Sequence, residues 1–147
     1  MQKKATKILP ALKWLPVPYS ERLKACHIPT LHYRRLRGDM IETYKIITGK
    51  YQGCVAPSLT KEAVYITRGN EFRLQKLWVR YDLRKFRFSS RVINNWNSLP
   101  NWFVSADTTN TFKARLDKFW DSQDIVYDFR AQLQGTGSRS EVLCEKF

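Results

Sequence analysis

The stretch "TLHYRRLRGDMIETYKIITG", residues 30–49, constrains the fold most. Thr30 is suited to cap the start of a helix, because its hydroxyl can accept a bond from a free backbone N–H. Gly49 is suited to end the helix. Gly38, inside it, is expected to mark a close approach of another backbone. Apolar residues recur every three or four positions, as in an amphipathic helix: Tyr33, Leu36, Met40, Tyr44 and Ile47. A helix with such a stripe needs partners to cover it.

Two shorter helices are the expected partners. The first begins after Ser89 or Ser90 as N-cap and ends at Leu99–Pro100, with Val92, Trp96 and Leu99 on one stripe. The second begins at about Thr109 with Thr108 as N-cap. Its apolar face consists of Phe112, Leu116, Phe119 and Trp120.

The two ends of the chain are expected to lie outside this core. "QKKATKIL" predicts the end of a basic helix that stops at Pro10, and the prolines at 10, 16 and 18 predict a linker over residues 1–19. A short helix should start from Ser20 as N-cap. Residues 20–130 then form one α-rich domain, and the small, polar run after residue 130 predicts a flexible, disordered tail over 131–147.

Residues 64–88 predict a small β-hairpin. "VYITRG" is β-branched or aromatic, and Phe86 and Phe88 alternate with Lys85 and Arg87 as in a half-buried strand. The fold class is therefore mainly α with a small β element. The alternation would bury both phenylalanines and display the cations outward, whereas Tyr65, Trp78 or Tyr81, if exposed, could stack on bases.

The charge is uneven along the chain. The formal net charge is +13, and residues 1–100 hold 20 basic and 6 acidic side chains against 6 and 7 in residues 101–147. Such a surplus favours a polyanionic partner. The sequence has no run of eighteen apolar residues, so it predicts no membrane-spanning helix. Three widely spaced cysteines, Cys26, Cys54 and Cys144, argue against a disulfide framework and favour an intracellular protein.

Catalytic and metal-binding patterns are weak. The spacing of Cys26, His27, His32 and Cys54 matches no zinc knuckle or finger. Asp39 and Glu42 could share a metal ion, but Arg35 and Lys45 at helical spacing favour intrahelical salt bridges. The acidic row Asp117, Asp121, Asp124 and Asp128 could look like a cation site and is better interpreted as a solvated face. No catalytic residue, metal ligand or cofactor is assigned.

Four ordered motifs resemble one family. "YRRLRGDMIETYKIITG" (33–49), "TRG" (67–69), "LRKFRFSSRVINNWNSLP" (83–100) and "VSADTTNTFKARLDKFW" (104–120) resemble the carboxyl-terminal region of reverse transcriptases from jockey-like non-LTR (LINE-type) retrotransposons. The opening "QKKATK" resembles the last helix of their thumb. The resemblance covers most of the chain, through about residue 130.

The resemblance implies a post-thumb module of an RNA-directed DNA polymerase that is encoded with an endonuclease. The polymerases of this family use Mg²⁺ held by palm aspartates, including an adjacent Asp-Asp pair that does not occur here. We therefore expect a truncated reading frame with no catalysis of its own and no cofactor, although the parent enzyme would use magnesium. The upstream polymerase domains are an implied partner, and a nuclear location is implied.

The sequence thus predicts a module that grips template RNA or target DNA by its phosphates, with little sequence preference. The alternative is a structural fragment that docks on the polymerase thumb and palm without touching nucleic acid. A third possibility is that the basic side chains named next are only solvated and bind no ligand. The predicted phosphate-binding cations are Arg34, Arg35, Arg37, Arg68, Arg73, Lys76, Arg80, Arg84, Lys85, Arg87 and Arg91.

Overall fold

A computed structural model describes residues 2–13, 16–61, 70–76, 78, 80–131 and 133, without the side chains of residues 11, 12, 82 and 85. These residues are mainly helical, as the sequence predicts. The helices in chain order are α1 (Gln2–Ala5), α2 (Pro10–Lys13), α3 (Tyr19–Ala25), α4 (Leu31–Ile47), α5 (Asp82–Lys85), α6 (Phe88–Ser98), α7 (Asn101–Val104), α8 (Thr109–Trp120) and the 3-10 turn η1 (Asp124–Val126). In this part of the chain, none of the helices combines the length and apolar character needed to cross a membrane.

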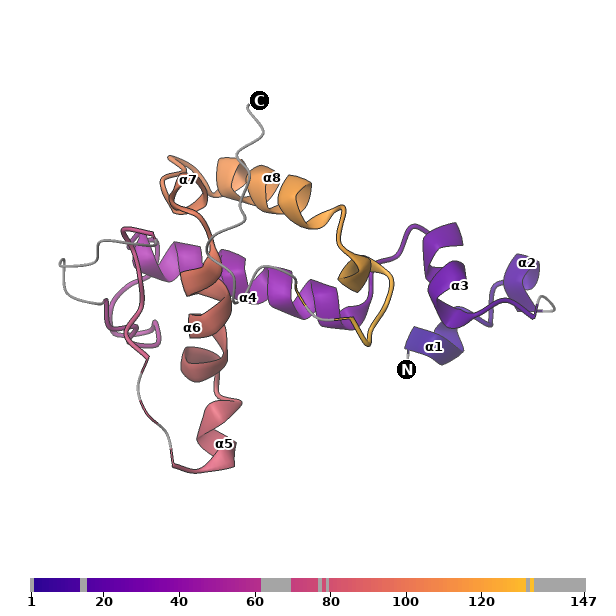
Figure 1. Cartoon of the computed structure of the whole chain (residues 1–147), viewed down its shortest axis with the longest axis horizontal. Coiled ribbons are helices and arrows are strands. Elements are labelled where there is room, and N and C mark those ends of the chain that lie inside the picture. Colours follow the sequence, from indigo (N-terminus) through magenta and orange to yellow (C-terminus); the bar gives the residue numbers. More distant parts are fainter. Residues whose placement is uncertain are drawn as a thin grey trace.

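The long helix α4 is the centre of the fold, and α6 and α8 both pack against it (Figure 1). Its predicted ends are confirmed. The Thr30 hydroxyl oxygen accepts a hydrogen bond from the Tyr33 N–H at 3.1 Å and donates to the Ile125 carbonyl at 2.8 Å, so one side chain caps α4 and holds η1. Gly49 has a φ of +70° just after the helix. Among the described residues, no atom beyond the helix backbone itself lies within 4 Å of a Cβ built on Gly38, so the predicted close approach of another backbone is not found there.

The core is formed by aromatic side chains from the three main helices. Tyr44 stacks on Phe112 with ring centroids 4.4 Å apart, and Trp96 contacts the same Phe112 ring at 6.0 Å. All three are almost fully buried. The Tyr44 hydroxyl donates to the Ala106 carbonyl at 2.5 Å, and this bond connects α4 to the loop before α8. The predicted apolar faces of α4 and α8 are confirmed, and so is Thr108 as the N-cap of α8.

The strand predicted around Phe86 and Phe88 is wrong, because these residues lie at a junction of two helices. Phe86 is the C-cap of α5 and Arg87, with extended φ and ψ, is the N-cap of α6. A single extended residue turns the chain, so the two rings separate: Phe88 packs against the core, whereas 72% of Phe86 is exposed. Neither Ser89 nor Ser90 is the cap, since α6 has already begun at Phe88. The predicted end at Leu99–Pro100 is confirmed.

Residues 62–69, the first part of the predicted hairpin, lie outside the described residues. The segment 70–76 makes one antiparallel bridge, from Lys61 to Leu74, and is held mainly by side chains of α6. Asn97 accepts from the Leu74 N–H and donates to the Leu74 carbonyl, both at 2.8 Å, as a neighbouring strand would. The Trp96 indole N–H donates to the Phe72 carbonyl at 2.8 Å. The amide of Asn97 and the indole of Trp96 therefore replace the pairing that the sequence assigned to a strand.

The N-terminal residues form a small assembly beside the main core (Figure 1). The helix predicted to run to Pro10 ends at Ala5, and Pro10 instead begins α2, a position where its missing N–H has no cost. The predicted cap Ser20 is wrong because α3 starts at Tyr19. The buried Arg22 donates to the Val17 carbonyl at 2.6 Å, where the sequence had given no reason to expect a buried cation.

Side chains of α1 reach the segment that leads into α4. Gln2 donates to the Pro29 carbonyl at 3.0 Å and accepts from the Tyr19 hydroxyl at 2.9 Å. These contacts neither confirm nor contradict the predicted domain boundary after residue 19. The predicted tail, residues 131–147, lies outside the described residues except for positions 131 and 133.

Replacing Tyr44 with Phe should lower the free energy of unfolding by about 1–2 kcal/mol, because the buried Ala106 carbonyl would lose its donor with no water to replace it. Chemical denaturation measures this change. Tyr51→Phe is the matched control: the Tyr51 hydroxyl donates to Glu42 at the surface, where water can substitute. Equal effects of the two substitutions would contradict the role given to the buried bond.

Replacing Asn97 with Ala should loosen the 70–76 segment on α6, because both bonds to the Leu74 backbone are lost. We expect faster proteolysis within residues 70–76 and a loss of about 1–3 kcal/mol in unfolding free energy. Asn94→Ala, at an exposed position of the same helix, should leave both unchanged. Unaltered cleavage in the Asn97 variant would show that the segment is held by other contacts.

Candidate nucleic-acid interface

The predicted cations fall into groups that differ in exposure. Arg68 lies outside the described residues, as does the side chain of Lys85. Arg37, Arg73 and Arg91 are half-buried. The remaining six are exposed: Arg34, Arg35, Lys76, Arg80, Arg84 and Arg87. The set is therefore not one uniform row of solvated side chains.

Arg91 is bound to a carboxylate of α4. Its Nε donates to Asp39 Oδ2 at 2.8 Å, its Nη2 to Asp39 Oδ1 at 2.7 Å, and its Nη1 to the Phe86 carbonyl at 3.3 Å. The hydrogen bond to Asp39 raises the pKa of Arg91, against a smaller opposing effect of burial. The predicted pairing of Asp39 with Arg35 is wrong. Arg91 instead ties the start of α6 and the end of α5 to α4.

Arg37 makes a second bidentate pair, on another side of α4. Its Nε and Nη2 donate to the two carboxylate oxygens of Asp117 in α8, at 2.5 and 2.7 Å. The hydrogen bond to Asp117 is also the main cause of the raised pKa of Arg37. Asp117, predicted to belong to a solvated acidic row, is thus an interhelical contact. Planar guanidinium groups suit this two-point geometry.

The other acidic residue of α4 behaves as predicted. Lys45 Nζ donates to Glu42 Oε1 at 2.8 Å, which is the expected intrahelical pair. The Tyr51 hydroxyl donates to the second oxygen of Glu42. These two hydrogen bonds, that of Lys45 first, lower the pKa of Glu42. The carboxylate is fully engaged within α4 and the turn that follows it.

Two exposed arginines lie where α5 meets α6, and a third, Arg35, lies on the side of α4 that faces α6. Arg84 lies in α5 and Arg87 at the cap between the helices, while Arg35 precedes Asp39 by one turn of α4 and so shares the side that binds Arg91. Figure 1 shows α5 beyond the start of α6, away from α7 and α8. This corner is the strongest candidate for a polyanion-binding surface.

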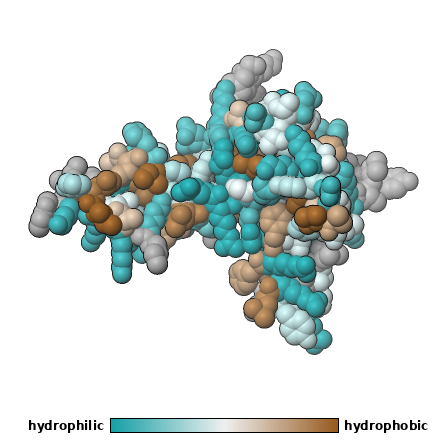
Figure 2. Space-filling view, turned by 180° about the vertical axis from the view of Figure 1, so that it is seen from behind, coloured by the Kyte–Doolittle hydropathy of each residue, from teal (hydrophilic) through white to brown (hydrophobic). Residues whose placement is uncertain are grey.

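The segment 78–87, here called the arm, adds exposed rings to this corner. Trp78 is 85% exposed, Tyr81 65% and Phe86 72%. Leu83 is 90% exposed. By sequence, the arm holds four basic residues and one acidic residue. Hydrophobic and hydrophilic surfaces accordingly lie side by side on the lowest projection of the molecule in Figure 2.

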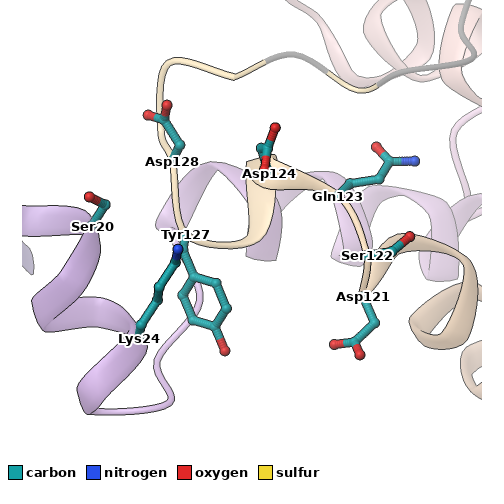
Figure 3. Close-up of a pocket in the computed structure, with 8 residues that line it drawn as sticks. All are labelled: Ser20, Lys24, Asp121, Ser122, Gln123, Asp124, Tyr127 and Asp128. Atoms are coloured by element: carbon teal, nitrogen blue, oxygen red, sulfur yellow. The ribbon is translucent and has the colours of Figure 1, made fainter.

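A different surface feature is acidic. An open pocket of about 360 Å³ lies between α3 and the segment after α8, lined by Ser20, Lys24, Asp121, Ser122, Gln123, Asp124, Tyr127 and Asp128 (Figure 3). Its three carboxylates point away from one another. Within the described part of the chain, no group of three or more His, Cys, Asp or Glu side chains is placed to hold a metal ion.

The sequence missed the partners of two arginines and the exposure of two arm residues. Asp39 and Asp117 bind cations on other helices, and neither spacing nor hydropathy signals such pairs. Leu83 lies in the four-residue helix α5 and Phe86 is its C-cap, and the side chains of both are exposed. The chain matches no family model, no curated protein and no solved structure in the comparisons made.

The two interhelical pairs should differ in their effect on stability. The Asp39 side chain is 11% exposed and that of Asp117 is 46% exposed. Asp39→Asn should therefore cost about 2–3 kcal/mol in unfolding free energy, because it leaves a half-buried guanidinium poorly paired. Asp117→Asn should cost about 1 kcal/mol or less, since water screens that pair. Thermal and urea unfolding compare the two, and a larger loss for Asp117→Asn would reverse this account.

Proposed function

We propose that this chain is a nucleic-acid-binding accessory module of a non-LTR retrotransposon reverse transcriptase, and that it holds RNA or DNA by the phosphate backbone. The four sequence motifs support the family, and the charge surplus in residues 1–100 supports a polyanionic ligand. The module acts without polymerase chemistry of its own. Its partners are the nucleic acid and the polymerase domains of the parent protein.

The observation that carries the proposal is the set of exposed arginines on a corner that a half-buried ion pair holds in place. Arg84 and Arg87 sit directly before the start of α6, and Arg91 fixes that joint to α4 through Asp39. Cations on an ordered surface lose less conformational entropy on binding than cations on a free tail. The binding set is reduced accordingly: Arg37 and Arg91 act as structural ties, and Arg35, Arg80, Arg84 and Arg87 contact phosphates.

A second candidate function is docking on the thumb and palm of the parent polymerase without nucleic-acid contact. The 90% exposure of Leu83 favours it, since a large aliphatic side chain gains by burial against a protein. The two functions differ in their dependence on salt. Docking through apolar contact should weaken little as salt rises, whereas phosphate binding releases counterions and weakens steeply.

Binding of the full chain to a random-sequence duplex should therefore weaken with salt. If four to six phosphates are neutralised, a plot of log affinity against log salt should have a slope of about −3.5 to −5.5. Filter binding or fluorescence anisotropy at several salt concentrations measures it. A slope near zero, or no binding at low salt, would overturn the proposal.

The position of the cations can be tested with two variants that lose the same amount of positive charge. Arg80→Gln, Arg84→Gln and Arg87→Gln together should weaken binding at least tenfold and make the slope shallower by about 2 to 3. The control combines Lys3→Gln, Lys4→Gln and Lys7→Gln, three exposed cations near α1 with the same change in net charge. If the two triple variants lose affinity equally, net charge alone governs binding and the arm is not the site.

A further inference from the structure

We propose that the rings of Trp78, Tyr81 and Phe86 stack on unpaired bases, so that the arm binds single-stranded RNA or DNA in preference to duplex. This inference rests on the proposed function and adds the class of ligand. Phosphate contacts alone do not distinguish strands from duplexes, whereas stacking requires a base with a free face.

The first argument is the contrast in burial within one chain. Trp96 is fully buried and Trp120 is 2% exposed, yet Trp78 is 85% exposed. The core thus buries two of the tryptophan rings, whereas the rings of the arm remain exposed to water. Trp102 is also partly exposed, but the centroid of its ring lies 3.8 Å from that of Phe103, and the Arg115 guanidinium lies over the Trp102 ring. The rings of the arm are far more exposed than that of Trp102.

The second argument is the alternation of rings and cations. Trp78 is followed two residues later by Arg80, Tyr81 adjoins Arg80, and Phe86 lies next to Arg87. A single-stranded ligand presents a phosphate and a base at every nucleotide, so a surface with a cation beside each ring can bind both groups. A protein partner that buried Leu83 and Phe86 would have to neutralise the arginines with acidic residues. A nucleic acid supplies that charge in every nucleotide.

The third argument is that the end of the arm is anchored. Arg91 Nη1 donates to the Phe86 carbonyl while the same guanidinium holds Asp39. The backbone that carries Phe86 is therefore fixed to α4, although its ring is in solvent. A ring held in position before binding costs less entropy to order against a base.

Each ring is tested by substitution to Ala in the full chain, with a 12-nucleotide oligo(U), the matching oligo(dT) and a 12-base-pair duplex as probes. Trp78→Ala, Tyr81→Ala and Phe86→Ala should each weaken binding of the single strands by about 5- to 100-fold. Duplex binding should change less than twofold. Leu83→Ala is the control, because it removes an exposed apolar side chain of the same segment that has no ring. The two single-stranded probes show whether RNA or DNA is preferred.

Quenching of tryptophan fluorescence is a second measurement, and a purely structural effect of a ring substitution would not change it. Oligo(U) should quench the emission of the unaltered chain, and Trp78→Phe should remove most of the quenching, because the other described tryptophans are much less exposed. If no probe binds, the proposed function fails and this inference with it. If all probes bind with the expected salt slope but ring removal has no effect, the proposed function stands and the stacking inference is wrong. Equal losses of single-strand binding from Leu83→Ala and Phe86→Ala would also overturn the stacking inference, because the effect would not depend on a ring.

Discussion

The buried face of α4 is the constraint on which the rest of the structure depends. Tyr44 stacks on Phe112 of α8, and Trp96 of α6 contacts the same ring, so three helices meet around one aromatic cluster. The hydroxyl of Tyr44 and the indole N–H of Trp96 then bind backbone carbonyls of the loops before α8 and before α5. The core therefore positions loops as well as helices, and the 70–76 segment has a defined place without a sheet.

The charges of α4 are divided between structure and surface. Arg37 and Asp39 are two residues apart, so they face different neighbours, and each takes an opposite charge from another helix. These pairs engage two of the predicted phosphate-binding arginines, and the pair of Arg91 with Asp39 also ties the corner where Arg84 and Arg87 are exposed to α4. Removing one partner of such a pair is destabilising, because the other charge is left poorly compensated away from bulk water.

The sequence predicted the helical elements well where a cap and an apolar stripe agree. Thr30 and Thr108 mark the starts of α4 and α8 because the hydroxyl of each accepts a hydrogen bond from a free backbone N–H in the first turn. Prediction failed where two structures share one pattern: Phe86 and Phe88 alternate like a strand, but a helix junction separates them. Pairs such as Arg37 with Asp117 were out of reach, because contacts 80 residues apart depend on how helices pack. The sequence thus named the basic residues of the candidate site. It did not predict which of them form ion pairs between helices and which stay exposed.

The most direct test of the account is to map where a nucleic acid touches the chain. Photo-cross-linking of the full chain to a short RNA that contains 4-thiouridine, followed by digestion and mass spectrometry, identifies the contacting residues. The account predicts cross-links concentrated in residues 78–87, with Trp78, Tyr81 or Phe86 as the modified side chains. Cross-links confined to α1–α3 or α8, with none in the arm, would contradict it.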